Sequence, residues 1–111
     1  MPEQNKPKDF RKSKGFRTLR QAMLDDLAAR GLDAAAYTDK VEEYMDFWAL
    51  RQELRADIAR RGLTVTDDRG RQTENRSVSL SVQVSRQMLA LFNAMGFKAG
   101  DLAGMAADDE L

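Results

Sequence analysis

Adjacent pairs of acidic residues are the feature of this sequence that could most readily support chemistry. They occur as Asp25-Asp26, Asp67-Asp68 and Asp108-Asp109. Two carboxylates can share a metal ion or act as an acid and a base. However, neighbours in sequence lie about 100° apart on a helix and on opposite faces of a strand. We therefore interpret the three pairs as a cap, a turn and a tail, and we predict no catalytic residue and no metal site.

The composition excludes most other catalytic chemistry. The 111 residues contain no His and no Cys, so the commonest general base, the commonest metal ligand and a thiolate nucleophile are all absent. The sequence also has no Gly-rich phosphate-binding loop followed by Lys and Ser or Thr, so we expect no ATP hydrolysis. We predict that the chain is not an enzyme and needs no cofactor.

The length and hydropathy indicate a single globular domain. Apolar residues make up 42% of the chain and charged residues 32%. No apolar run approaches the roughly 20 residues that span a bilayer, and the first residues lack the apolar stretch of a secretory signal. We therefore expect a cytoplasmic protein with no membrane partner.

The zero net charge conceals strong segregation of charge. Residues 1–20 carry a net charge of +5 and residues 101–111 a net charge of −4. Oppositely charged ends are typical of interaction tails, although they can also simply keep a protein soluble. We predict that the basic residues near the N-terminus bind DNA phosphates: Lys6, Lys8, Arg11, Lys12, Lys14, Arg17 and Arg20. A weaker hypothesis assigns the binding of a partner protein to the acidic residues Asp108, Asp109 and Glu110.

Three segments are predicted along the chain. Residues 1–14 contain almost no apolar side chains and should form a flexible basic arm. Residues 15–107 should form a single helical domain, followed by an acidic tail at 108–111. The first helix of the domain is predicted to begin at Thr18, where Thr18 and Gln21 fit a capping box, and to end before Gly31.

A long helix is predicted over about 38–61, ended by Gly62. Its apolar side chains cover an arc of roughly 220°, whereas one core face needs only about 100°. We expect the excess to form contacts between copies of the chain, making it a homo-oligomer. The predicted interface residues are Tyr44, Phe47, Trp48, Arg51, Leu54, Arg55 and Ile58. The two arginines either pack their stems while their charged ends reach solvent, or form ion pairs across the contact.

A short β-hairpin or extended loop is predicted at about 63–74, and another helix at about 78–95. Residues 77–85 alternate polar and apolar side chains like a strand, but a helix accounts for the apolar residues as far as Met95. A last short helix is predicted over about 99–107. The expected fold class is all-α, with an antiparallel helical hairpin as its core and an additional N-terminal helix.

The order of several short motifs resembles a known family. A stretch from Tyr44 to Trp48 lies on the long helix, Gly62 begins a β-type loop, Asn75 precedes the next helix, and that helix ends in the segment 91–97. This pattern, over about residues 18–105, resembles the small terminase subunits of tailed bacteriophages and prophages, of the phage twenty-seven type. Arg76 stands where the family commonly has Pro, which leaves helix capping to Asn75 or Ser77.

The resemblance implies a role in packaging DNA. Small terminase subunits bind double-stranded viral DNA, assemble as homo-oligomeric rings and regulate a large subunit that carries the ATPase and nuclease. It also implies that the chain acts in the cytoplasm of a bacterial host. Two alternatives remain at this point: a helical regulator that binds nucleic acid, and a non-catalytic oligomerisation adaptor.

Overall fold

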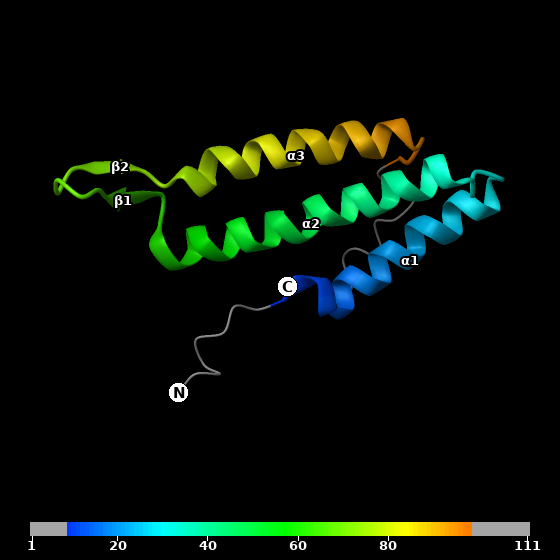
Figure 1. Ribbon diagram of the computed structural model, residues 1–111, viewed down its shortest axis with the longest axis horizontal. Coiled ribbons are helices and arrows are strands. Elements are labelled where there is room, and N and C mark those ends of the chain that lie inside the picture. The colour runs from blue at the N-terminus through cyan, green and yellow to red at the C-terminus, as the bar shows by residue number, and fades with distance from the viewer. Residues whose placement is uncertain (1–8, 99–111) are drawn as a thin grey trace.

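The computed structural model describes residues 9–98, which form three α-helices, a single-turn helix and a two-stranded hairpin (Figure 1). The elements are η2 (Phe10–Lys12), α1 (Lys14–Ala29), α2 (Ala35–Arg61), β1 (Thr64–Thr66), β2 (Gln72–Glu74) and α3 (Arg76–Ala94). This confirms the predicted all-α class with a helical hairpin at its core. The short helix predicted over 99–107 lies outside the described residues.

The first helix begins one turn earlier than the sequence predicted. The hydroxyl of Ser13 accepts a hydrogen bond from the backbone N–H of Phe16 at 3.1 Å, so Ser13 caps α1 and the predicted start at Thr18 is wrong. Immediately before it, Asp9 caps η2, and the ring of Phe10 is only 9% exposed. Residues 9–14 of the predicted flexible arm therefore form part of the fold, because Phe10 supplies an apolar anchor.

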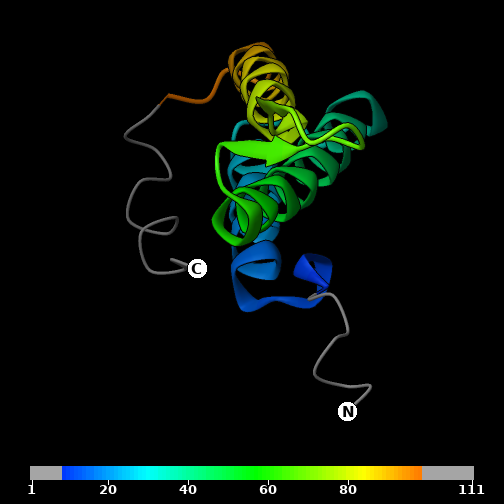
Figure 2. The same cartoon turned by 90° about the vertical axis from the view of Figure 1, so that its left-hand side faces the viewer.

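Helix α2 lies between α1 and α3, as both views show (Figures 1 and 2). On the α1 side, Phe16 packs edge-on against Trp48 with ring centroids 5.9 Å apart, and Met23 is fully buried. On the α3 side, Val84 and Met88 belong to the same buried core. Two neighbouring helices in the same chain thus account for most of the wide apolar arc of α2.

A polar network joins the end of α2 to the start of α3. The side chain of Asn75, which is fully buried, accepts from the N–H of Ser77 at 3.0 Å and donates to the carbonyl of Gly62 at 2.9 Å. Asp57 accepts hydrogen bonds from Arg61 at 2.7 and 2.8 Å and from the hydroxyl of Ser77 at 2.7 Å. These bonds, that from Arg61 foremost, hold the pKa of Asp57 far below its ordinary value. Asn75 therefore caps α3, which confirms one of the two predicted alternatives, Asn75 and Ser77.

The hairpin projects beyond the ends of α2 and α3 (Figure 1). Its strands are antiparallel, with Val65 opposite Thr73. The carboxylate of Asp67 closes the turn by accepting from the N–H groups of Arg69 and Arg71, each at 2.9 Å. Local hydrogen bonding, rather than apolar burial, thus holds this connection.

Helix α3 is continuous from Arg76 to Ala94 despite the alternating pattern at its start. Two of the serines satisfy their hydroxyl groups on the helix itself. Ser79 donates to the carbonyl of Arg76 at 3.2 Å, and Ser81 donates to that of Val78 at 2.9 Å. Such back-bonding lets serine occupy a helix interior, so the predicted helix is confirmed over the strand alternative.

Candidate nucleic-acid and oligomer interfaces

Two of the predicted DNA-binding arginines form ion pairs with acidic residues on α2. Arg11 is bonded to Asp46, and the guanidinium of Arg20 contacts Glu42 through Nε at 2.9 Å and Nη2 at 2.5 Å. The hydrogen bond that Arg20 donates to Glu42 raises the pKa of Arg20 above its ordinary value. These pairs fasten η2 and α1 to α2, so the charges of Arg11 and Arg20 are already compensated within the chain.

Three other predicted residues lie together at the start of α1. Lys12, Lys14 and Arg17 are all exposed, and Lys12 lies 4.0 Å from the carboxylate of Asp9. Arg17 donates to the backbone carbonyl of Lys12 at 2.5 Å. Because a carbonyl carries no full negative charge, this bond does not neutralise the guanidinium. The first turn of α1 holds no acidic residue, and the N-terminal end of a helix carries partial positive charge. This corner is therefore suited to bind an anion. Lys6 and Lys8 lie outside the described residues, as do Asp108, Asp109 and Glu110.

Most of the predicted oligomer-interface residues pack inside the chain instead. Trp48 is 9% exposed and Leu54 8%, and Phe47 and Ile58 are partly buried. Tyr44 packs against Phe92 of α3 with ring centroids 6.2 Å apart, and this burial raises the pKa of its hydroxyl. Trp48, Leu54, Tyr44 and Phe47 belong to the core of the chain or pack against it, whereas Arg51 and Arg55 line an open groove.

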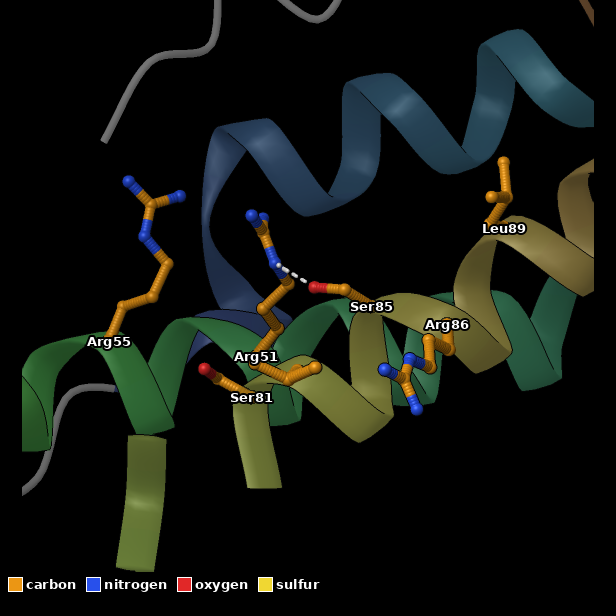
Figure 3. Close-up of a pocket in the computed structure, with 7 residues that line it drawn as sticks. Arg51, Arg55, Ser81, Ser85, Arg86 and Leu89 are labelled. Atoms are coloured by element: carbon orange, nitrogen blue, oxygen red, sulfur yellow. Dashed lines mark hydrogen bonds between the residues drawn. The ribbon is translucent and has the colours of Figure 1, made fainter. Parts of the chain in front are cut away.

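Those two arginines line a groove of about 500 Å³ between α2 and α3 (Figure 3). Arg51 and Arg55 extend from α2 one turn apart, and Nε of Arg51 donates to the hydroxyl of Ser85 at 3.0 Å. Leu89, which is 60% exposed, lies further along α3. We call this surface the arginine groove; its lining residues are Arg51, Arg55, Ser81, Val82, Ser85, Arg86 and Leu89.

The groove carries positive charge without a balancing carboxylate. Among the described residues, neither Arg51, Arg55 nor Arg86 has a carboxylate within ion-pair distance. The positions three and four residues before and after each of them hold no Asp or Glu, so no helical ion pair is possible there. The sequence prediction missed Ser81, Val82, Ser85, Arg86 and Leu89. Their spacing of three and four residues on one helix is a signal that could have grouped most of them.

A second hollow, of about 480 Å³, lies along another side of α2. Leu50 is 42% exposed there. Glu53 is exposed, and its side chain makes no hydrogen bond or ion pair in the described part of the chain, although its charge interacts at longer range with Arg11. We call this surface the acidic hollow; it is lined by Phe10, Leu50, Glu53, Leu54, Ala56, Asp57 and Arg60. Because Glu53 and Arg55 are two residues apart on a helix, they point about 200° away from each other.

Within residues 9–98, no three acidic side chains come close enough together to hold a metal ion. The same range contains no helix that is both long and apolar enough to cross a bilayer.

Comparison with known proteins gives one match. Neither the curated proteins nor the solved structures contain a detectable relative of this chain. A family model described as the small subunit of phage terminase matches residues 17–110. The match covers both partners of the helical hairpin and the polar network at Asn75 that joins them. The chain therefore belongs to the phage terminase small subunit family.

Proposed function

We propose that this protein is the non-catalytic small subunit of a phage or prophage DNA-packaging terminase. In this role it binds double-stranded viral DNA and regulates the large subunit that supplies the ATPase and nuclease. It acts as a homo-oligomeric ring in the cytoplasm of the bacterial host. The observation that carries this proposal is the family match over residues 17–110. The absence of His and Cys from the sequence supports a subunit without its own catalytic chemistry.

We assign the contacts to DNA phosphates to five cations near the N-terminus: Lys6, Lys8, Lys12, Lys14 and Arg17. The last three are exposed around the start of α1, where the positive end of the helix adds to their attraction for phosphate. Arg11 and Arg20 are left out of this set because each is hydrogen-bonded directly to a carboxylate of α2, Asp46 or Glu42. Lys12 is kept because it approaches Asp9 only at 4.0 Å and its side chain remains 84% exposed. Lysine and arginine contacts of this kind hold DNA without reading its sequence.

The acidic residues Asp108, Asp109 and Glu110 are proposed to contact the large subunit. Residues 101–111 contain four acidic residues and no basic residue. DNA would repel such a segment, so a protein partner suits it better. Co-purification of the large subunit with the full chain, and its loss when all three residues are changed to Ser, tests this contact. Undiminished co-purification with the triple variant would contradict it.

The salt dependence of DNA binding tests the phosphate assignment. Five neutralised phosphates per copy predict a slope of log K against log salt of about −4.5, at about −0.9 per phosphate. Changing Lys12, Lys14 and Arg17 to Ala should make the slope shallower by about 2.7. Fluorescence anisotropy with labelled double-stranded DNA measures both values.

The paired arginines provide the matched control. The double variant Arg11→Ala/Arg20→Ala also removes two cations, yet it should leave the slope of the salt dependence unchanged. An equal or larger change of slope in this control would show that Arg11 and Arg20 contact DNA, and would contradict the assignment.

A further inference from the structure

We propose that the arginine groove of one copy receives the acidic hollow of a second copy, with Arg55 of the first facing Glu53 of the second. The inference rests on one part of the proposed function, the assembly of copies into a homo-oligomer. It goes further by naming the two surfaces that meet. Each surface is described within a single chain, on α2 and its neighbours.

The two surfaces are chemically complementary. The arginine groove presents positive charge that no carboxylate of the described residues neutralises, whereas Glu53 in the acidic hollow is exposed and lacks an ion-pair partner there. Within the chain, Glu53 interacts with Arg11 only at longer range, so joining the two surfaces would give Arg55 and Glu53 a direct ion-pair partner each. Complementary potentials of this kind fix the register of an interface and exclude wrong partners.

Apolar side chains accompany the charges on both surfaces. Leu89 is 60% exposed and Val82 48% in the groove, and Leu50 is 42% exposed in the hollow. A phosphate backbone would leave these side chains in water, whereas a protein surface would bury them, which is favourable by about 25 cal/mol per Å² of apolar area. This favours a second copy over DNA as the occupant of the groove.

The placement of the surfaces dictates how copies would join. Arg55 and Glu53 point in nearly opposite directions from α2, about 200° apart. A contact between unlike surfaces on opposite sides is heterologous, so each copy keeps one unused surface to bind the next copy. Repetition of such a contact produces a ring when the rotation between copies closes. The structure thus assigns to α2 a role at both sides of every subunit contact.

Charge reversal of the two facing residues tests the inference on the full-length chain. Arg55→Glu and Glu53→Arg each place like charges opposite each other, and each should weaken assembly at least tenfold, as measured by sedimentation velocity over a concentration series. Both side chains are exposed and make no hydrogen bond within residues 9–98, so circular dichroism should show an unchanged fold. An equimolar mixture of the two variants should assemble again, because each mixed contact pairs opposite charges.

Matched reversals elsewhere serve as controls. Arg69→Glu in the hairpin turn and Asp33→Arg between α1 and α2 alter the same charges on exposed side chains and should leave assembly unchanged. Assembly of Arg55→Glu or Glu53→Arg at the wild-type concentration would overturn the inference, as would failure of the folded mixture to assemble. So would loss of DNA binding by Arg55→Glu with assembly intact, because the groove would then hold phosphate.

The outcomes also separate this inference from the proposed function. A wild-type chain that stays monomeric contradicts both the inference and the ring. Wild-type assembly that ignores both charge reversals contradicts the inference alone and leaves the packaging role and its DNA-binding test in place.

Discussion

Removal of the buried Asn75 side chain should be among the most damaging single changes where the end of α2 meets the start of α3. Asn75→Ala deletes the cap of α3, a loss of about 1 kcal/mol. It also deletes the donor to the carbonyl of Gly62, and leaving that polar group without a partner costs about 1–3 kcal/mol. Together we expect a loss of about 3 kcal/mol in the free energy of unfolding.

Thermal unfolding followed by circular dichroism measures this loss. For a domain of this size, about 3 kcal/mol corresponds to a fall in Tm of about 12–24 °C. The protein concentration is held constant, because any association of copies would also raise Tm. The fluorescence of Trp48, which is buried between α1 and α2, reports the same transition independently.

Two further variants locate the effect. Asn75→Asp keeps the oxygen that accepts from Ser77 but places a second, buried acceptor against the carbonyl of Gly62, so its Tm should also fall well below that of the wild type. Asn93→Ala changes the same residue type at an exposed position of α3 and should shift stability by no more than about 0.5 kcal/mol. Equal stability of Asn75→Ala and Asn93→Ala would refute the role given to the hydrogen bonds of Asn75.

Three other changes should alter stability in defined ways. Because its folded pKa lies below the ordinary value, Asp57 contributes its full stabilisation above about pH 4 and loses it as the pH falls further. Asp57→Asn should therefore flatten the acid limb of the stability profile in urea titrations between about pH 5 and pH 2, and an unchanged limb would contradict this. Gly96→Ala forces a left-handed residue, at a φ of 78°, and brings its Cβ to 2.9 Å from Nη1 of Arg30; we expect a loss of about 1–2 kcal/mol in chemical denaturation, and wild-type stability would contradict the strain. Met23→Ala empties a fully buried site and should cost about 2–5 kcal/mol, a prediction that fails if its Tm matches that of the wild type.

The elements of this fold could be predicted from sequence wherever the signal is local. Gly62 ends α2 with a φ of 87°, and the apolar pattern as far as Met95 identified α3 despite the alternating start. The start of α1 was misplaced because Thr18 and Gln21 also fit a cap. The choice was settled by Phe10, whose burial against the rest of the fold orders the residues before Ser13.

The residues that are available for an interface could not be predicted from one helix at a time, because neighbouring helices decide which side chains are buried or ion-paired. The wide apolar arc of α2 indicated contacts between copies, but Trp48 and Leu54 pack within the chain, because two helices cover α2 from different sides. Likewise, charge alone could not separate Arg20 from Lys14. The difference is Glu42, which lies 22 residues further along the sequence and meets Arg20 only after α1 folds back on α2.

The packaging of viral DNA tests the central claim most directly. Deletion of this gene from the phage or prophage that encodes it should leave capsids without DNase-resistant DNA, and expression of the wild-type chain in the same cells should restore it. Capsids that retain a full amount of protected DNA after the deletion would contradict the account.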